Sequence, residues 1–261
     1  DITTTGGTLS GLAVTADPKV YTATFTPSAN TNAGNASITV ASGSYTDAAG
    51  NTGGAGTTPS LSFDTLAPTL SITSNTSTLK AGQTATVSFS FSEAPSGFTT
   101  SDITTTGGTL SGLAVTADPK VYTATFTPSA NTNAGNASIT VASGSYTDAA
   151  GNTGGAGTTP SLSFDTLAPT LSITSNTSTL KAGQTATVSF SFSEAPSGFT
   201  TSDITTTGGT LSGLAVTADP KVYTATFTPS ANTNAGNASI TVASGSYTDA
   251  AGNTGGAGTT P

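Results

Sequence analysis

The sequence predicts an all-β chain built from small β-sandwich domains that follow one another in tandem. The first observation behind this prediction is a repeat. The segment DITTTGGTLSG begins at Asp1, Asp102 and Asp203, which is a period of 101 residues. Residues 1–101 and 102–202 are identical, and residues 203–261 repeat the first 59. Because the units of solenoid proteins run to roughly 20–50 residues, this longer period has the size of a whole small domain.

The second observation is an alternation of apolar and polar side chains with a period of two, which is typical of half-buried strands. Residues 85–92 read ATVSFSFS and residues 121–127 read VYTATFT, with threonine suited to the solvated face. Clusters of Gly, Pro, Asn and Asp separate these runs at the spacing of a sandwich. In chain order, the strands expected in one repeat are 69–73, 85–92, 103–106, 110–116, 121–127, 137–142 and 161–164.

About seven strands in this order predict an immunoglobulin-like sandwich without its disulfide, and tandem copies predict an elongated rod. Tyr146 either forms a corner of the tyrosine type or simply packs. The expected core of one repeat consists of Phe89, Phe91, Phe98, Tyr122, Phe126, Ile139, Val141 and Phe164.

The boundary between domains is expected at the segment Asp64-Thr65-Leu66-Ala67-Pro68, which recurs at 165–169. Proline has no N–H and ends strand pairing, so Pro68 suits a linker. We therefore expect a complete repeat at 68–168, a repeat at 169–261 that lacks its last strand, and a partial repeat at 1–67 that lacks the first two strands. On this interpretation the chain is a window from a longer array, and its first unit exposes an open core and is not stable alone.

Composition excludes several classes of function. The 261 residues include five basic and 13 acidic side chains, a net charge of −8, and no His, Cys, Met or Trp. This leaves no basic surface for nucleic acid, no disulfide or Cys/His zinc site, and no catalytic triad. No apolar run approaches the roughly 20 residues of a membrane span, and the first residues do not resemble a signal peptide. We expect a soluble, acidic segment that is not an enzyme and does not insert into a membrane.

Acidic residues concentrate in the linker and in the loops that share one pole of the expected sandwich. Such a cluster of anions repels itself, and a hard cation removes the conflict. Calcium accepts six to eight oxygens from carboxylates, Asn side chains and carbonyls in flexible geometry, whereas magnesium keeps its waters. Acidic loops that merely keep a Ser/Thr-rich surface soluble are the alternative. The candidate calcium ligands are Asp64, Glu93, Asp102, Asp118, Asp148 and Asn152, with copies at Asp165, Glu194, Asp203, Asp219, Asp249 and Asn253.

Three segments of the repeat, FSEAPSGFTTSDI, YTDAAGNTGGAG and FDTLAPTLSI, resemble the bacterial Ig-like repeats of very large biofilm-associated and RTX-type surface adhesins. The resemblance covers the whole chain. It implies extender repeats on the bacterial cell surface that are exported by type I secretion and stiffened by calcium at domain junctions. Adhesion to host or abiotic surfaces and biofilm formation would then depend on modules outside this chain. By motif position, the resemblance assigns calcium to Asp64, Glu93, Asp102 and Asp148, with copies at Asp165, Glu194, Asp203 and Asp249, whereas Asp118 and Asp219 come from the loop argument alone.

Two other functions are compatible with the sequence. The repeats could bind glycan or protein ligands weakly, with avidity from many copies, and Phe98 is the best loop aromatic for such contacts. An enzyme would have to use a carboxylate pair such as Glu93 and Asp102, as in glycoside hydrolysis. The identical copies favour a structural role, in which the immediate partners of each repeat are its neighbours in the chain.

Overall fold

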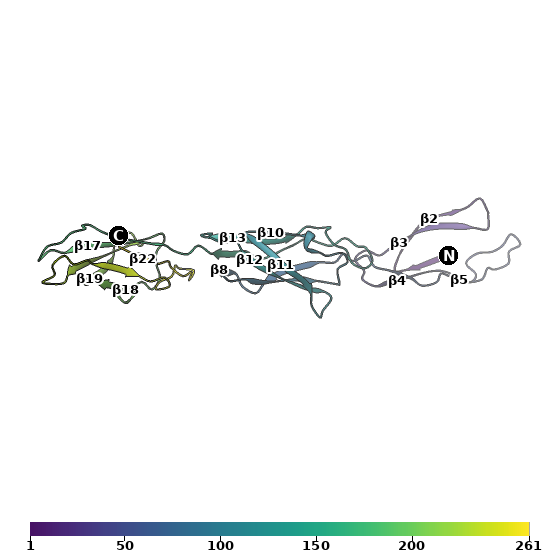
Figure 1. The fold of residues 1–261 in the computed structure, drawn as a ribbon. Helices are drawn as coiled ribbons and strands as arrows, with labels where there is room; N and C mark the ends of the chain where they lie inside the picture. Colours follow the sequence, from purple (N-terminus) through teal and green to yellow (C-terminus); the bar gives the residue numbers. More distant parts are fainter. Residues whose placement is uncertain (261) are drawn as a thin grey trace.

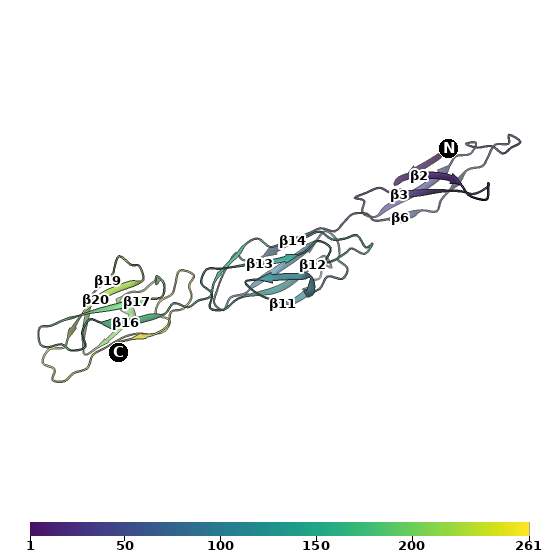
Figure 2. The same ribbon diagram turned by 90° about the horizontal axis from the view of Figure 1, so that it is seen from above.

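The computed structural model describes residues 1–260 as three β-rich units that follow one another along an extended chain. Figures 1 and 2 show the same end-to-end arrangement in two views, with the N-terminal unit at one end and the C-terminal unit at the other. The prediction of tandem immunoglobulin-like sandwiches is confirmed. No helix among the described residues is long and apolar enough to cross a membrane.

The middle unit has the two sheets of an immunoglobulin-like sandwich. Its elements are β7 (Leu70–Ser74), β8 (Thr78–Lys80), β9 (Ala85–Phe91), η1 (Thr100–Asp102), β10 (Ile103–Thr106), β11 (Gly108–Val115), β12 (Val121–Pro128), β13 (Gly135–Val141), β14 (Gly157–Thr158) and β15 (Leu162–Asp165). One sheet has the order β11-β12-β9-β7, and the other has the order β10-β13-β15-β8 with β14 also paired to β13. The seven expected strands are all present. The sequence did not predict β8, which runs parallel to β15, or the two-residue β14.

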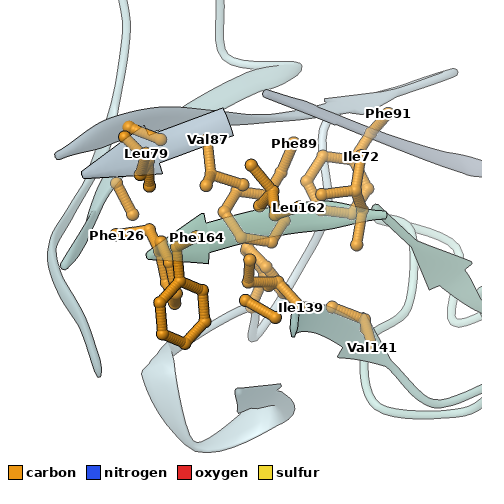
Figure 3. Close-up of a cluster of buried hydrophobic side chains, with 14 of the residues drawn as sticks. Ile72, Leu79, Val87, Phe89, Phe91, Phe126, Ile139, Val141, Leu162 and Phe164 are labelled. Carbon is orange, nitrogen blue, oxygen red and sulfur yellow. The ribbon is translucent and has the colours of Figure 1, made fainter. Parts of the chain in front are cut away.

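The core lies between these sheets, where alternate side chains of β9, β12 and β13 point inward (Figure 3). Of the eight residues expected in the core, Tyr122 is half-buried and packs against the cluster, and the other seven are buried. Glycine makes room for an aromatic ring at the start of β13, since a Cβ at Gly135 would overlap the ring of Phe164. Core packing thus depends on Gly135 as well as on apolar residues.

The third unit repeats this arrangement except in one sheet, where β21 (Ser239–Val242) has four residues and β13 of the middle unit has seven. Its copy of β8, residues 179–181, forms no strand, and the described residues of this unit include no copy of β15, the partner of β8 in the middle unit. The elements of the third unit are β16 (Leu171–Ser175), β17 (Ala186–Phe192), η2 (Thr201–Asp203), β18 (Ile204–Thr207), β19 (Gly209–Val216), β20 (Val222–Pro229), β21 (Ser239–Val242) and β22 (Gly258–Thr259).

The first unit is an open half of the same sandwich, because residues 1–63 contain no copy of β7, β8 or β9. Its elements are β1 (Ile2–Thr5), β2 (Gly7–Val14), β3 (Tyr21–Pro27), β4 (Gly34–Val40), β5 (Gly56–Thr57) and β6 (Leu61–Phe63). The face that β9 covers in the middle unit is uncovered here. Tyr45 is 54% exposed, whereas its copy Tyr146 is 2% exposed. Identical residues therefore bury very different areas in the two units.

This difference predicts unequal costs for the same substitution. Ile139→Ala removes a fully buried side chain, so it is expected to destabilise the middle unit by about 2–5 kcal/mol. Ile38→Ala, at the matching position of the open unit, should cost less because Ile38 is only half-buried. Urea denaturation of the full chain, followed by tyrosine fluorescence, measures both. Equal shifts for the two variants would contradict the open structure of the first unit.

Candidate metal centre at the junctions

The linker Asp64–Pro68 is bonded to the units on both of its sides. Toward the first unit, the N–H of Thr65 donates to the carbonyl of Thr31 at 2.9 Å, and its hydroxyl donates to the carbonyl of Ser28 at 2.7 Å. The second linker repeats these contacts through Thr166, at 2.8 Å to Thr132 and 2.6 Å to Ser129. Each linker is therefore fixed to the unit that precedes it.

On the other side, the linker is held by the loop that joins β13 to β14. The carbonyl of Pro68 accepts the N–H of Gly155 at 2.9 Å and the hydroxyl of Tyr146 at 3.3 Å. Tyr146 therefore both packs in the core and ties the linker down. From the sequence alone, the role of Tyr146 stays open between a corner and simple packing. The only signal for Thr65 and Thr166 is a polar residue next to the linker aspartate.

The same loop positions a buried carboxylate next to the linker. Asp148 is 2% exposed, and its two oxygens accept the backbone N–H of Asn152 at 2.8 Å and the side-chain amide of Asn152 at 2.7 Å. The amide also donates to the carbonyl of Asp64 at 3.2 Å. The tight loop requires a positive φ at Gly151, +92°, which glycine adopts without strain.

Three carboxylates meet at each junction. One oxygen each of Asp64, Glu93 and Asp148 lies within 4.8 Å of the others, and Asp165, Glu194 and Asp249 form the same group at the second junction. Glu93 comes from the segment after β9, which a pair of backbone hydrogen bonds between Ser96 and Thr147 joins to the β13–β14 loop. Oε1 of Glu93 is buried without a hydrogen-bond partner, and Oε1 of Glu194 is in the same state.

The environment acts in opposite directions on the members of this group. Burial raises the pKa of Glu93, the negative charges of Asp148 and Asp64 raise it further, and the charge of Lys120 lowers it only in part. Burial, then Asp165 and Asp249, raise the pKa of Glu194 in the same way. The glutamate is thus the member of each cluster that has too little positive charge or hydrogen bonding around it.

Asp148 differs because its charge is solvated by the protein. Burial alone would raise the pKa of Asp148, but hydrogen bonds from the Asn152 side chain and backbone and from the N–H groups of Gly151 and Ala150 outweigh it. The pKa of Asp148 is therefore lowered. At neutral pH this aspartate stays ionised and repels Glu93.

The geometry fits a calcium ion. Calcium–oxygen distances of about 2.3–2.6 Å let two ligands on opposite sides of one ion lie roughly 4.6–5.2 Å apart. A spread of 4.8 Å falls within this range, so one ion can contact all three carboxylates of a cluster. An unpartnered, buried Glu93 oxygen is also a ready ligand, because it need not give up a hydrogen bond to bind a cation.

The structure brings together three of the five predicted carboxylates of each repeat. The carboxylate of Asp102 instead accepts from the N–H and hydroxyl of Thr99, at 2.7 and 3.0 Å, and caps η1. That of Asp118 accepts from the N–H of Lys120 at 3.0 Å in its own turn. Their copies make the same contacts, Asp203 with Thr200 and Asp219 with Lys221.

Two further predicted residues are placed differently from the expectation. Asn152 and Asn253 lie at the clusters, where their amide nitrogens face the aspartate oxygens as donors. Phe98, the loop aromatic considered for ligand contact, is only 7% exposed and packs edge-on against Phe91 and Tyr122. It belongs to the core, as the other prediction for it stated, and offers no contact surface.

The fold and the junctions define this chain as a tandem array of immunoglobulin-like domains. A family model described as a bacterial Ig-like domain matches residues 1–63, 64–164 and 165–261. The chain therefore belongs to the bacterial Ig-like domain family. The second and third matches begin on the linker aspartates, four residues before the boundaries expected at 68 and 169.

Solved structures of similar fold come from diverse proteins. The adhesin InvE of Yersinia pseudotuberculosis matches with 14% identity and a TM-score of 0.28, over 74% of this chain and 58% of that chain. The I9–I11 tandem of titin matches with 11% identity and a TM-score of 0.28, over 74% and 63% of the two chains. The ectodomain of mouse nectin-like molecule 4 matches with 12% identity and a TM-score of 0.30, over 73% of this chain and 61% of that chain. Similarity at this level carries no argument about this chain. A comparison with curated proteins gives no match.

The opposed pKa shifts predict a stability maximum at acidic pH in excess chelator. Protonation of Glu93 and Glu194 relieves repulsion, so the melting temperature should rise as the pH falls from 7 toward the ordinary glutamate pKa of roughly 4.3. Below roughly pH 3.9 it should fall, because Asp148, whose pKa is lowered by folding, then loses its charge and its hydrogen bonds.

The double variant Glu93→Gln, Glu194→Gln is the control for this profile. In this variant the melting temperature should no longer rise as the pH falls from 7 toward the ordinary glutamate pKa. It should still fall at lower pH. Calorimetry across the pH range measures both arms. A melting temperature that declines steadily from pH 7 in the unsubstituted chain would contradict the assignment.

Proposed function

We propose that this chain consists of structural extender repeats of a bacterial cell-surface adhesin, stiffened by calcium at the junctions between repeats. The observation that supports it most is the cluster of three carboxylates at each junction, with a buried glutamate oxygen that has no partner. In this role the repeats are secreted, lie outside the cell and project a distal adhesive module. Contact with a host or abiotic surface, and any part in biofilm formation, then depends on modules outside this chain.

The origin of the ligands explains how an ion would act on the junction. Asp64 belongs to the linker, whereas Glu93 and Asp148 belong to the unit that follows it. A calcium ion supplies positive charge that these three carboxylates share. Its binding would join linker and unit, and the linker is already bonded to the preceding unit through Thr65. The angle between the two units would then have less freedom.

A spacer role also agrees with the surfaces of the repeat. Strands of up to eight residues plus loops add on the order of 35–45 Å per repeat, so identical copies give length in proportion to their number. The aromatic side chains of the middle unit's core are packed against one another, and Phe98 is buried among them. A site for stacking on sugar rings would need such a side chain at the surface.

Calcium titration of the full chain tests the proposal. Saturating calcium at about 100 times its dissociation constant should stabilise each binding unit by about 2.7 kcal/mol relative to chelator. Small-angle scattering should show a longer and stiffer particle under the same conditions. Glu93→Gln and Glu194→Gln should each remove one of two cation-dependent steps, because each belongs to one cluster.

Asp219→Asn provides the matched control. It removes one negative charge from the third unit, as Glu194→Gln does, but Asp219 lies outside the cluster. Its calcium response should equal that of the unsubstituted chain. If neither melting temperature nor scattering changes with calcium, or if Asp219→Asn and Glu194→Gln lose the same response, the proposed stiffening is wrong.

A further inference from the structure

The second junction contains a direct contact between consecutive units that involves none of the three clustered carboxylates as an acceptor. It joins the turn after β8 in the middle unit to the loop between β21 and β22 in the third unit. The ammonium of Lys80 donates to the carbonyl of Gly252 at 3.0 Å, and the N–H of Ala81 donates to Oδ1 of Asn253 at 2.8 Å. Figure 1 places β8 at the end of the middle unit that faces the third unit.

The side chain of Asn253 is central to this contact. While its oxygen accepts from Ala81, its amide nitrogen donates to Oδ2 of Asp249 at 2.7 Å and to the carbonyl of Asp165 at 3.0 Å. One side chain thus connects the preceding unit, the linker and the loop of the following unit. Asn253 is 2% exposed, so these polar atoms depend on one another rather than on water.

The identical repeats supply an internal comparison. At the first junction, the copy of this loop has no turn to receive it, because residues 1–63 contain no copy of Lys80 or Ala81. Asn152, the counterpart of Asn253, is there only half-buried. A Cβ at Gly252 would lie 3.1 Å from the ammonium of Lys80, whereas a Cβ at Gly151 would have no neighbour within 4 Å. Since the loop sequences are the same, the neighbouring turn causes the difference.

We propose that the turn at residues 80–83 is a docking element for the next repeat of the same chain, and that it fixes the angle of the junction without any cation. The partner is a loop that offers a backbone carbonyl and a side-chain amide oxygen as acceptors, as the sequence DAAGN does. The element operates wherever a complete repeat precedes another. It is separate from the calcium proposal, since its donors are an ammonium and a backbone N–H.

The turn geometry allows a sharp test. The N–H of Gln83 donates to the carbonyl of Lys80 at 3.1 Å, and Gly82 has a φ of +77°, which together describe a type II turn with Ala81 as its second residue. Proline is favoured at that position, and the residue before it lies in a strand, which proline also tolerates. Ala81→Pro therefore keeps the turn and removes the N–H that donates to Asn253.

The matched control is Ala182→Pro, in the copy of this turn in the third unit. There the N–H of Gln184 donates to the carbonyl of Lys181 at 3.0 Å, and Gly183 has a φ of +79°. The chain has no cysteine, so spin labels at Thr125→Cys and Thr226→Cys report the distance between the middle and third units. Both positions are exposed on matching strands, β12 and β20. Labels at Thr24→Cys and Thr125→Cys report the first junction.

Pulsed electron paramagnetic resonance in excess chelator gives the distribution of each distance. Ala81→Pro should broaden the distribution across the second junction, with the population away from the main distance rising roughly fivefold, as expected for the loss of one buried hydrogen bond. Lys80→Ala should act in the same direction. Ala182→Pro should change neither distance distribution. The distribution across the first junction should stay the same in all three variants.

Unchanged distributions in Ala81→Pro and Lys80→Ala would overturn the docking element, and so would equal broadening in Ala182→Pro. Calcium added afterwards separates this proposal from the previous one. If calcium does not narrow the distance distribution of the unsubstituted chain, calcium stiffening is contradicted. The docking element is still tested by the broadening that Ala81→Pro and Lys80→Ala cause in chelator. Melting temperatures confirm that each variant is folded.

Discussion

The short connection between units is the constraint on which the rest of the structure depends. Only five residues separate the end of β15 from the start of β16, and hydrogen bonds hold this segment from both sides. A linker this short keeps the facing ends of consecutive units close together. It brings the linker aspartate against the loops of the following unit. The acidic cluster and the contact made by Lys80 both follow from that enforced proximity.

Proximity of like charges then divides the carboxylates into two kinds. Asp148 is tolerated because donors from its own loop replace the water that burial removes. Glu93 has no such donors for Oε1 and faces two aspartates, so its ionised form is the unstable element of the junction. A proton or a cation can relieve that instability. The hydrogen bonds of Thr65 and Tyr146 keep the linker in place whichever of the two is present.

The sequence predicted the strands well because their signal is local and repeated. Alternation over seven residues defines β9, whereas the two residues of β14 and the three of β8 are too short to show a period. The sequence also located the acidic pole, but could not tell which carboxylates meet there. Asp102 and Asp118 lie two or three residues from N–H groups that capture them, and such local hydrogen bonds compete with a distant cluster. The donors Lys80 and Ala81 depend on a partner 172 residues away, which no local pattern reveals.

All repeats share one sequence, so a junction joins one end of a repeat to the opposite end of the next. One end presents the carboxylates and the loop with Asn253, and the other presents the ammonium of Lys80 and the carbonyls that bind the linker threonine. Such a head-to-tail interface is heterologous, and it gives an open array unless its rotation closes a ring. Because covalent linkers set the order of the units, each added complete copy repeats the junction seen between the middle and third units. The length of the array is therefore determined by copy number, and a complete repeat carries the residues for both sides of the junction.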